Sequence, residues 1–416
     1  MGDIDRKRAE RLMQAAGLDA LVLFQPEAFR YAIGAPAGVA TMWGRAGAAI
    51  AIVPADSSVS LGAVASDHAA GMILKKAPSV DLRIHRIWID LVDMNGAETV
   101  ADIDPLYKRS GRAGSRPETF DRAASYNLLF DILKERNLAR GRIGVDLEFV
   151  PAADFEALKH ALPNIQWVDG SEVLRRLRAV KTSLEIERLR RAASAAEGGL
   201  ARMMELIKPG ASVSDLSAAW KVGAQDTAKA RGFALSGHWD FISVGPDLSD
   251  MSAIVTAGAV IKADVGTLVD GYSSDGARTF SHGPVSSLAQ DIFKALESAF
   301  AVGLEEIKPG NSFGAVHQAM LMSMRRDGLG EYYRGHFGHS VGGSVGIKEW
   351  PFFSADNPEI IEVDMVIALE APFYGENFGA LMIEDQFLVT STGVDDMNTM
   401  PRELVDTSGD QPKSVR

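Results

Sequence analysis

The chain has 416 residues, of which 46% are hydrophobic and 24% are charged, and its formal net charge at pH 7 is −12. This length exceeds one ordinary hydrophobic core and predicts two domains, and the acidic balance argues against general nucleic-acid binding, which needs a basic surface. Because the chain contains no cysteine, disulfides, thiolate metal ligands and a cysteine nucleophile are excluded, and we expect a soluble protein in the reducing cytoplasm.

The beginning of the chain is unlike a targeting signal. Met1–Arg11 is rich in charged residues, whereas a secretory signal needs an apolar stretch. No apolar run elsewhere approaches the roughly 20 residues that span a bilayer. We therefore expect neither a secretory signal nor a membrane partner.

The first part of the chain alternates short helical and strand patterns. Apolar residues recur at helical spacing over Arg6–Ala16, and the pattern ends at Gly17. The next predicted elements are strands at Leu18–Phe24 and Ala48–Val53 and helices near Tyr126–Glu135 and Ala153–Leu162. This alternation predicts an α/β domain over residues 1–170. Within it, the basic, glycine-containing segment Lys108–Pro117 is predicted to be a mobile loop.

A second domain is predicted from residue 171 to residue 405. A connector near Val168–Gly170 leads into a charged stretch, which predicts one long helix that continues to about Met204. Residues 406–416 are polar, and we expect them to form a frayed tail.

An internal repeat divides the second domain. The hexapeptide Ile207–Ser212 (IKPGAS) recurs 100 positions later as Ile307–Ser312 (IKPGNS). In each copy the Pro-Gly pair would end one helix, and the serine would begin the next. The repeat predicts two similar α/β halves related by a pseudo-twofold axis. The alternative is a common helix–turn signal that occurs twice by chance.

Five residues of the second domain form a candidate metal site. They are four carboxylates and one imidazole, namely Asp264, Asp275, His339, Glu370 and Glu384. Carboxylate oxygens can bridge two adjacent divalent cations, and an imidazole shifts the preference from Mg²⁺ or Ca²⁺ toward Mn²⁺, Co²⁺, Fe²⁺ or Zn²⁺. The alternatives are solvated turn carboxylates, glutamates paired with arginine, and a hydrogen-bonded structural histidine.

The spacing of the two aspartates favours a shared position. Asp264 follows an apolar stretch, and Asp275 lies 11 residues further along the chain. Gly271 and Tyr272 between them predict a turn, so two antiparallel strands would bring both carboxylates together. The glycines around His339 would let the backbone approach an ion closely.

These segments together resemble a known family. The segments are, in chain order, Asp264–Gly266, Gly271–Phe280, Gly338–Gly342, Glu370–Pro372 and Ile383–Thr390. The series resembles the pita-bread metallopeptidases, which include methionine aminopeptidase, prolidase, aminopeptidase P and creatinase. Arg8–Gly34 is similar to the amino-terminal domain of prolidases and creatinase. The resemblance implies an α/β chain with a creatinase- or prolidase-like N-terminal domain and a pita-bread catalytic domain that contains the internal repeat.

The resemblance also implies a role for each candidate ligand. Asp264 and Asp275 would hold one metal ion, Asp275, His339 and Glu370 would hold the other, and Glu384 would bridge them. Arg278 would support a ligand carboxylate. The implied cofactors are two divalent ions, with Mn²⁺ preferred and Co²⁺, Fe²⁺ or Zn²⁺ as alternatives.

The implied activity is that of an Xaa-Pro dipeptidase or aminopeptidase. The ions would lower the pKa of a shared water, Glu370 would accept its proton, and an amide carbonyl would be attacked. Family members with this N-terminal domain are commonly homodimers in which one subunit borders the site of the other. Lys108–Pro117 is a candidate for that border.

Two positions depart from the family pattern. Peptidases of the family carry a histidine upstream of the first metal aspartate and another after the metal histidine. Here the segment from Gly245 to Asp264 contains no histidine, and the second position is occupied by Lys348. Lys348 would be either a solvated surface charge or a group that binds a carboxylate or transfers a proton.

Three further residues are candidates for the substrate side of the site. His336 is a candidate catalytic group, and His238 and Trp350 are candidates for contact with the substrate or support of the ligands. For His238 the alternative is a packed loop position. The departures leave room for relatives that act on small non-peptide substrates, such as ectoine hydrolase or dimethylsulfoniopropionate lyase. A non-catalytic binding protein of the same fold is a further alternative, against which the complete ligand set argues.

Overall fold

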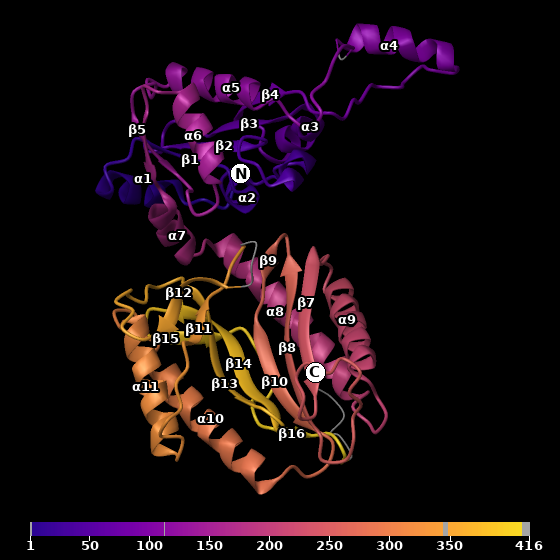
Figure 1. Cartoon of the computed structure of the whole chain (residues 1–416), viewed down its shortest axis with the longest axis vertical. Coiled ribbons are helices and arrows are strands. Elements are labelled where there is room, and N and C mark those ends of the chain that lie inside the picture. Colours follow the sequence, from indigo (N-terminus) through magenta and orange to yellow (C-terminus); the bar gives the residue numbers. More distant parts are fainter. Residues whose placement is uncertain (1, 112, 344–347, 410–416) are drawn as a thin grey trace. The chain divides into compact units, whose positions relative to one another are not determined.

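The computed structural model describes residues 2–111, 113–343 and 348–409. The chain forms two compact units, Met1–Arg178 and Ala179–Arg416, whose elements are labelled in Figure 1. Within these described ranges, no helix combines the length and the apolar character that a membrane crossing requires. The predicted polar tail falls partly outside them, at residues 410–416.

The N-terminal unit is a six-stranded sheet with helices on both faces (Figure 1). Its strands are β1 (Ala20–Leu23), β2 (Ile50–Pro54), β3 (Gly62–Ser66), β4 (Asp81–His85), β5 (Arg142–Val145) and β6 (Gln166–Asp169), in the sheet order β4-β3-β2-β1-β5-β6. Its helices are α1 (Arg6–Ala15), α2 (Pro26–Ile33), α3 (Asp67–Lys76), α4 (Ile103–Ser110), α5 (Arg122–Glu135), α6 (Ala152–Ala161) and α7 (Ser171–Ala179), with the 3₁₀ helices η1 (Val39–Trp43) and η2 (Val100–Asp102).

Side-chain alternation along β1 separates the two cores of this sheet. Leu21 and Leu23 pack in the core that contains residues of α1, α2, α3 and α7. Ala20 and Val22 pack in the core that contains residues of α5 and α6. Successive side chains of a strand point to opposite faces, so one short apolar strand serves both layers.

One segment of the N-terminal unit forms an arm. Ile87 and Phe120 pair in an isolated bridge at its base, and the residues between them carry η2 and α4 (Figure 1). No residue of α4 is buried. The loop predicted at Lys108–Pro117 is wrong for Lys108–Ser110, which form the last turn of α4. The left-handed Gly111, with φ of 67°, ends the helix, and residue 112 lies outside the described residues.

The C-terminal unit is built on a ten-stranded sheet covered by two helix pairs (Figure 1). Its helices are α8 (Ser183–Met204), α9 (Val213–Ala230), α10 (Ser287–Glu306) and α11 (Phe313–Arg326). Its strands are β7 (Gly237–Val244), β8 (Val260–Val269), β9 (Tyr272–Ser273), β10 (Gly276–Ser281), β11 (His336–Ser340), β12 (Glu349–Ser354), β13 (Val366–Gly375), β14 (Gly379–Thr390), β15 (Gly393–Asp396) and β16 (Val405–Asp406). The main path runs β12-β11-β13-β14-β10-β8-β7.

The long helix predicted at the start of this unit is wrong, because the chain forms α7 and α8 with a break between them. Thr182 caps α8 with its hydroxyl oxygen, which accepts the N–H of Glu185, and the Glu185 carboxylate accepts the N–H of Thr182. Val180, just before this cap, pairs with Met365 of the sheet region. The capping box and this bridge together fix the break.

The repeated hexapeptides occupy equivalent positions in the two halves of the unit. Ser212 caps α9, and Ser312 caps α11. Gly210 and Gly310 have φ angles of 90° and 96°, and the N–H of each donates to a carbonyl in a later loop. Glycine tolerates this left-handed conformation at the end of a helix, so the same local chemistry turns the chain twice.

Candidate metal centre

Strand alternation places three acidic side chains on the sheet face opposite to the helices. In β8, Ala263 and Val265 belong to the core that packs against α8 and α9, so Asp264 between them faces the other way. In β13 and β14, the residues that precede Glu370 and Glu384 belong to the core against α10 and α11. Both glutamates therefore point to the same face of the sheet as Asp264, the face without helices.

The sheet register aligns these acids across four neighbouring strands. Asp264 of β8 pairs with Ala277 of β10, Ala277 pairs with Glu384 of β14, and Glu384 pairs with Glu370 of β13. Neighbouring strands lie about 4.8 Å apart, so the row is short. Asp275 lies just before β10, beside this row. The register thus brings together carboxylates that are far apart in the sequence.

Three buried groups converge closely enough to hold one cation. Asp275, His339 and Glu384 each offer a ligand atom, and these atoms all lie within 4.8 Å of one another. His339 Nδ1 lies 2.9 Å from the carbonyl oxygen of Ser340, which assigns the ring proton to Nδ1 because a carbonyl only accepts. Nε2 then carries a lone pair. It lies 3.3 Å from Asp275 Oδ2 and has no hydrogen-bond partner among the described residues.

This arrangement fits a divalent transition metal. An unprotonated imidazole nitrogen and two carboxylates, all buried, are the donor set that Mn²⁺, Fe²⁺, Co²⁺ and Zn²⁺ accept. The carbonyl that orients His339 is the kind of outer hydrogen bond that metal-ligating histidines make. A bound cation would give Nε2 the partner that the described residues do not supply.

Burial raises the pKa of two carboxylates in the row. For Glu384 burial is the main cause, and the negative charges of Asp275 and Glu370 add to it, so the pKa lies well above its ordinary value. Burial also raises the pKa of Asp264, to about 6, although Lys262 opposes the rise. Crowded buried carboxylates are costly to ionise, and a cation would remove much of that cost.

Protein cations accompany the two outer carboxylates. Lys262 Nζ lies 3.1 Å from Asp264 Oδ2, and Arg334 Nη2 lies 3.2 Å from Glu370 Oε1. His336 Nδ1 lies 2.9 Å from the same Glu370 oxygen. Burial alone would raise the pKa of Glu370, but the His336 hydrogen bond and the Arg334 charge outweigh it and lower the pKa to about 2. Glu370 is therefore ionised throughout the neutral range.

The remaining predicted residues are placed in two groups. Lys348 is close to the site, because its Nζ lies 3.2 Å from His336 Nε2. Arg278 donates to Asp385 Oδ1 at 2.7 Å and to the carbonyl oxygen of Glu384 at 2.9 Å. It therefore holds the backbone of β14 at the candidate ligand Glu384.

His238 and Trp350 are placed differently. His238 is exposed on β7, and its ring lies 6.1 Å from that of the buried Trp220. Trp350 packs against the apolar core under α10 and α11. The structure thus brings His336 and Lys348 to Glu370, whereas these two side chains contact apolar neighbours.

Sequence analysis missed several residues that shape the site. Lys262 could have been found, because a residue two positions before Asp264 on a strand faces the same way. Arg334 lies outside any strand, and no local pattern links it to Glu370. Phe352 of β12 lies near the site, with its ring 5.9 Å from that of His339 and tilted by 57° to it.

A buried lysine supports the backbone beside His339. Lys181 donates to Ser340 Oγ at 2.8 Å and lies 3.6 Å from Glu349, and its side chain is fully buried. Ser340 is the residue whose carbonyl orients the His339 ring. Lys181 therefore helps to hold Ser340 in place beside the His339 ring.

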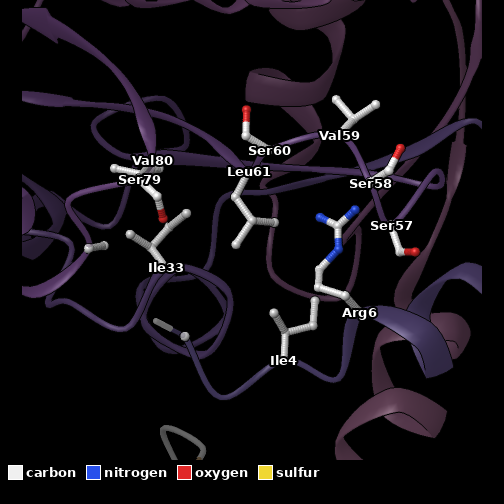
Figure 2. A pocket seen from close by; sticks show the side chains of 12 residues that line it. Ile4, Arg6, Ile33, Ser57, Ser58, Val59, Ser60, Leu61, Ser79 and Val80 are labelled. Atoms are coloured by element: carbon white, nitrogen blue, oxygen red, sulfur yellow. The ribbon is translucent and has the colours of Figure 1, made fainter.

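Two cavities differ in their relation to the row of acids. One, of about 730 Å³, lies beside Asp264 and is lined by residues of β7, β8 and α9 and by Tyr374. The other, of about 230 Å³, lies in the N-terminal unit, where Arg6 and the Ser57–Ser60 loop face Ile33 and Leu61 (Figure 2). The second cavity is mainly apolar and contains none of the predicted site residues. The first is lined by Asp264 and has room for a small substrate, so it is the candidate substrate cavity.

Comparison with known proteins gives consistent matches over both units. Residues 187–391 match metallopeptidase family M24, and residues 87–180 match the creatinase/prolidase N-terminal domain. The chain is 32% identical over 267 residues to the probable dipeptidase PepE of Mycobacterium bovis, covering 62% of this chain and 68% of that one. It is 26% identical over 274 residues to an Xaa-Pro dipeptidase of Lactobacillus helveticus, covering 64% and 73%.

A solved structure extends the similarity to nearly the whole chain. The Xaa-Pro dipeptidase of Bacillus anthracis superimposes with a TM-score of 0.75 at 19% identity, over 96% of this chain and 98% of that one. At this identity the likeness concerns the fold. Both chains thus share the fold in which the row of acids of this chain lies.

Proposed function

The chain belongs to metallopeptidase family M24 and is a metal-dependent hydrolase, and from this premise we propose that it cleaves the amide bond of Xaa-Pro dipeptides or of similar short peptides. The convergence of Asp275, His339 and Glu384, with the unpaired Nε2 of His339 between them, carries the proposal. Relatives described as dipeptidases support the choice of a short peptide as substrate.

We infer that the five ligands have the capacity for two divalent ions. Asp275, His339 and Glu384 form the inner position, and Asp264 and Glu370 complete the set at its two sides. Mn²⁺ is the first choice for this mixture of carboxylates and imidazole, with Co²⁺, Fe²⁺ or Zn²⁺ as alternatives. Bound cations would polarise the scissile carbonyl and lower the pKa of the attacking water.

The residues around Glu370 handle the proton in this proposal. Glu370 is kept ionised by Arg334 and His336, so it can accept a proton from the attacking water. His336 Nδ1 lies 2.9 Å from the carboxylate and its Nε2 lies 3.2 Å from Lys348, so the proton has a path of polar contacts toward the leaving amine. Lys348 is exposed and offers an ammonium group to the carboxylate of a dipeptide.

A second candidate function follows from one observation. The segment from Gly245 to Asp264 lacks the histidine that the family's peptidases carry there, so the substrate side of the site is altered. A hydrolase or lyase for a small non-peptide substrate would retain the same metal ligands. A panel of Xaa-Pro dipeptides assayed with Mn²⁺, beside cyclic amidines and sulfonium zwitterions, separates the two. Efficient cleavage of the dipeptides alone supports the peptidase, and turnover of the other compounds alone rejects it.

We also propose that the chain is a homodimer. The arm that carries α4 has no buried residue in that helix, and Val100 beside it is 84% exposed. A segment with so little packing would gain stability by docking against a partner. Sedimentation of the full chain should give twice the chain mass of 44.6 kDa. Deletion of residues 103–117 should yield the monomer and weaken substrate binding without changing metal content; an unchanged dimer would reject this role of the arm.

A further inference from the structure

Lys262 is placed to neutralise Asp264. The two residues lie two positions apart on β8 and therefore face the same side of the sheet. Their charged atoms are 3.1 Å apart, and their side chains are only 8% and 16% exposed. The ammonium also lies 5.9 Å from the centre of the Tyr374 ring, a distance at which a ring face attracts a cation. The ammonium group of Lys262 thus contacts both the Asp264 carboxylate and the Tyr374 ring.

The five candidate metal ligands fall into two groups according to the side chains that contact them. Asp264 is paired with Lys262 and Glu370 with Arg334, whereas the inner group formed by Asp275, His339 and Glu384 contains the orphaned imidazole nitrogen. Each outer carboxylate therefore has a lysine or arginine partner, whereas among the described residues the inner group has no ion pair to either residue type.

We propose that Lys262 competes with a metal ion for Asp264, so that the chain holds one ion tightly at Asp275, His339 and Glu384 and a second only weakly. This inference rests on the proposed metal-dependent function. Lys262 and Asp264 both line the cavity of about 730 Å³, so the ammonium has room to leave the carboxylate when a second ion enters. The weak position would fill only at high metal concentration, which makes Lys262 a determinant of metal stoichiometry.

Metal counting on the intact protein tests this. The chelated full-length chain is titrated with MnCl₂, and bound ions are counted by native mass spectrometry and elemental analysis. The wild type should bind one ion tightly and a second at least about tenfold more weakly, since an ion must break a charged hydrogen bond to enter. Lys262→Met and Lys262→Gln should each bind two ions, with the second tightened by about tenfold.

A control comes from another lysine–aspartate pair, of which the aspartate lines the same cavity. Lys221 Nζ lies 3.2 Å from Asp240, and Asp240 lines the cavity away from the inner ligand group. Lys221→Met should keep the wild-type stoichiometry and affinities, and circular dichroism establishes that each variant is folded.

Each remaining outcome has a distinct meaning. Two equally tight ions in the wild type, or a single ion in both folded Lys262 variants, would overturn the role of Lys262. No bound ion in any form of the chain would instead overturn the proposed metal-dependent function. The two failures are therefore distinguishable in one set of titrations.

Discussion

The Nε2 atom of His339 lies 3.3 Å from Oδ2 of Asp275, yet in the part of the chain that the structure describes this buried nitrogen has no hydrogen-bond partner. Its ring proton is committed to the carbonyl of Ser340 on the other side, so the lone pair faces the carboxylate. Two acceptors facing each other in a buried site are unfavourable unless a third, positive partner lies between them. The pair is therefore the strongest local indication of a metal position.

Asp275→Asn should remove the metal and the activity together. The substitution keeps the size of the side chain but loses the anionic oxygen, so the inner position loses one of its three donors. Loss of outer hydrogen bonds to metal ligands alone costs 10- to 100-fold, and loss of a ligand should cost at least about 100-fold in kcat/KM. Elemental analysis and circular dichroism should show a folded protein without metal; full occupancy and an unchanged rate would contradict the assignment.

Once a chelator has removed bound metal, the stability of the protein should fall as the pH rises from about 4 to about 6. Burial raises the pKa of Asp264 to about 6 and raises that of Glu384 well above its ordinary value, so the folded chain holds protons that the unfolded chain releases near pH 4. A raised carboxyl pKa means that stability falls as pH rises from the unfolded toward the folded pKa, by about 3 kcal/mol for Asp264 alone. Glu370, with its pKa lowered to about 2, stabilises the folded chain throughout this window, and its contribution is lost only as the pH falls further.

Thermal melting between pH 4 and pH 8 measures this dependence. The chelated wild type should melt at a lower temperature at pH 8 than at pH 5, and Mn²⁺ should restore more stability at pH 8. Asp264→Asn removes the titrating group and should flatten the chelated profile. The same slope in wild type and variant would show that Asp264 does not titrate as described.

Arg334→Met should alter the acid limb of the pH–rate profile. Arg334 is one of the groups that hold the pKa of Glu370 down, and its guanidinium lies 3.2 Å from the carboxylate. Its loss should raise that pKa and move the acid limb of kcat/KM upward. The exposed Arg325 on α11 supplies a control, and Arg325→Met should leave the profile in place. An unmoved acid limb in Arg334→Met would separate Glu370 from proton transfer.

Gly338→Ala should damage the site through the backbone. Gly338 has φ of 122°, and a Cβ there would lie 2.0 Å from the carbonyl oxygen of Ala368 on β13. The pairing of β11 with β13 holds His339, so the substitution should lower both stability, by more than about 2 kcal/mol, and metal affinity. Gly335→Ala is the matched control, because nothing lies within 4 Å of its added Cβ. Equal melting temperatures and metal affinities in the two variants would refute this account.

The fold could be predicted because its signals are local and ordered. The α/β architecture with a creatinase-like first domain and a pita-bread second domain is confirmed by the matched families and the superimposed structure. The equivalent serine caps at Ser212 and Ser312 follow directly from the repeated hexapeptide. The break before α8 was missed, although the Thr182–Glu185 spacing is a recognisable capping box.

The electrostatic partners of the site could not be predicted in the same way. The pairing of Arg334 with Glu370 joins residues 36 positions apart, and that of Lys181 with Ser340 joins residues 159 positions apart. Such pairs depend on sheet register and on side-chain direction, which single-sequence periodicity does not specify. The residue types of the ligand row were therefore readable from the sequence, whereas the cations that tune it were visible only in three dimensions.

Anomalous diffraction from crystals grown with excess MnCl₂ tests the central claim most directly. We expect a manganese peak bonded to Nε2 of His339 and to carboxylate oxygens of Asp275 and Glu384, with weaker density beside Asp264. A manganese peak elsewhere, or no peak with these three side chains apart or paired to arginine or lysine, would contradict the metal centre and the hydrolase mechanism built on it.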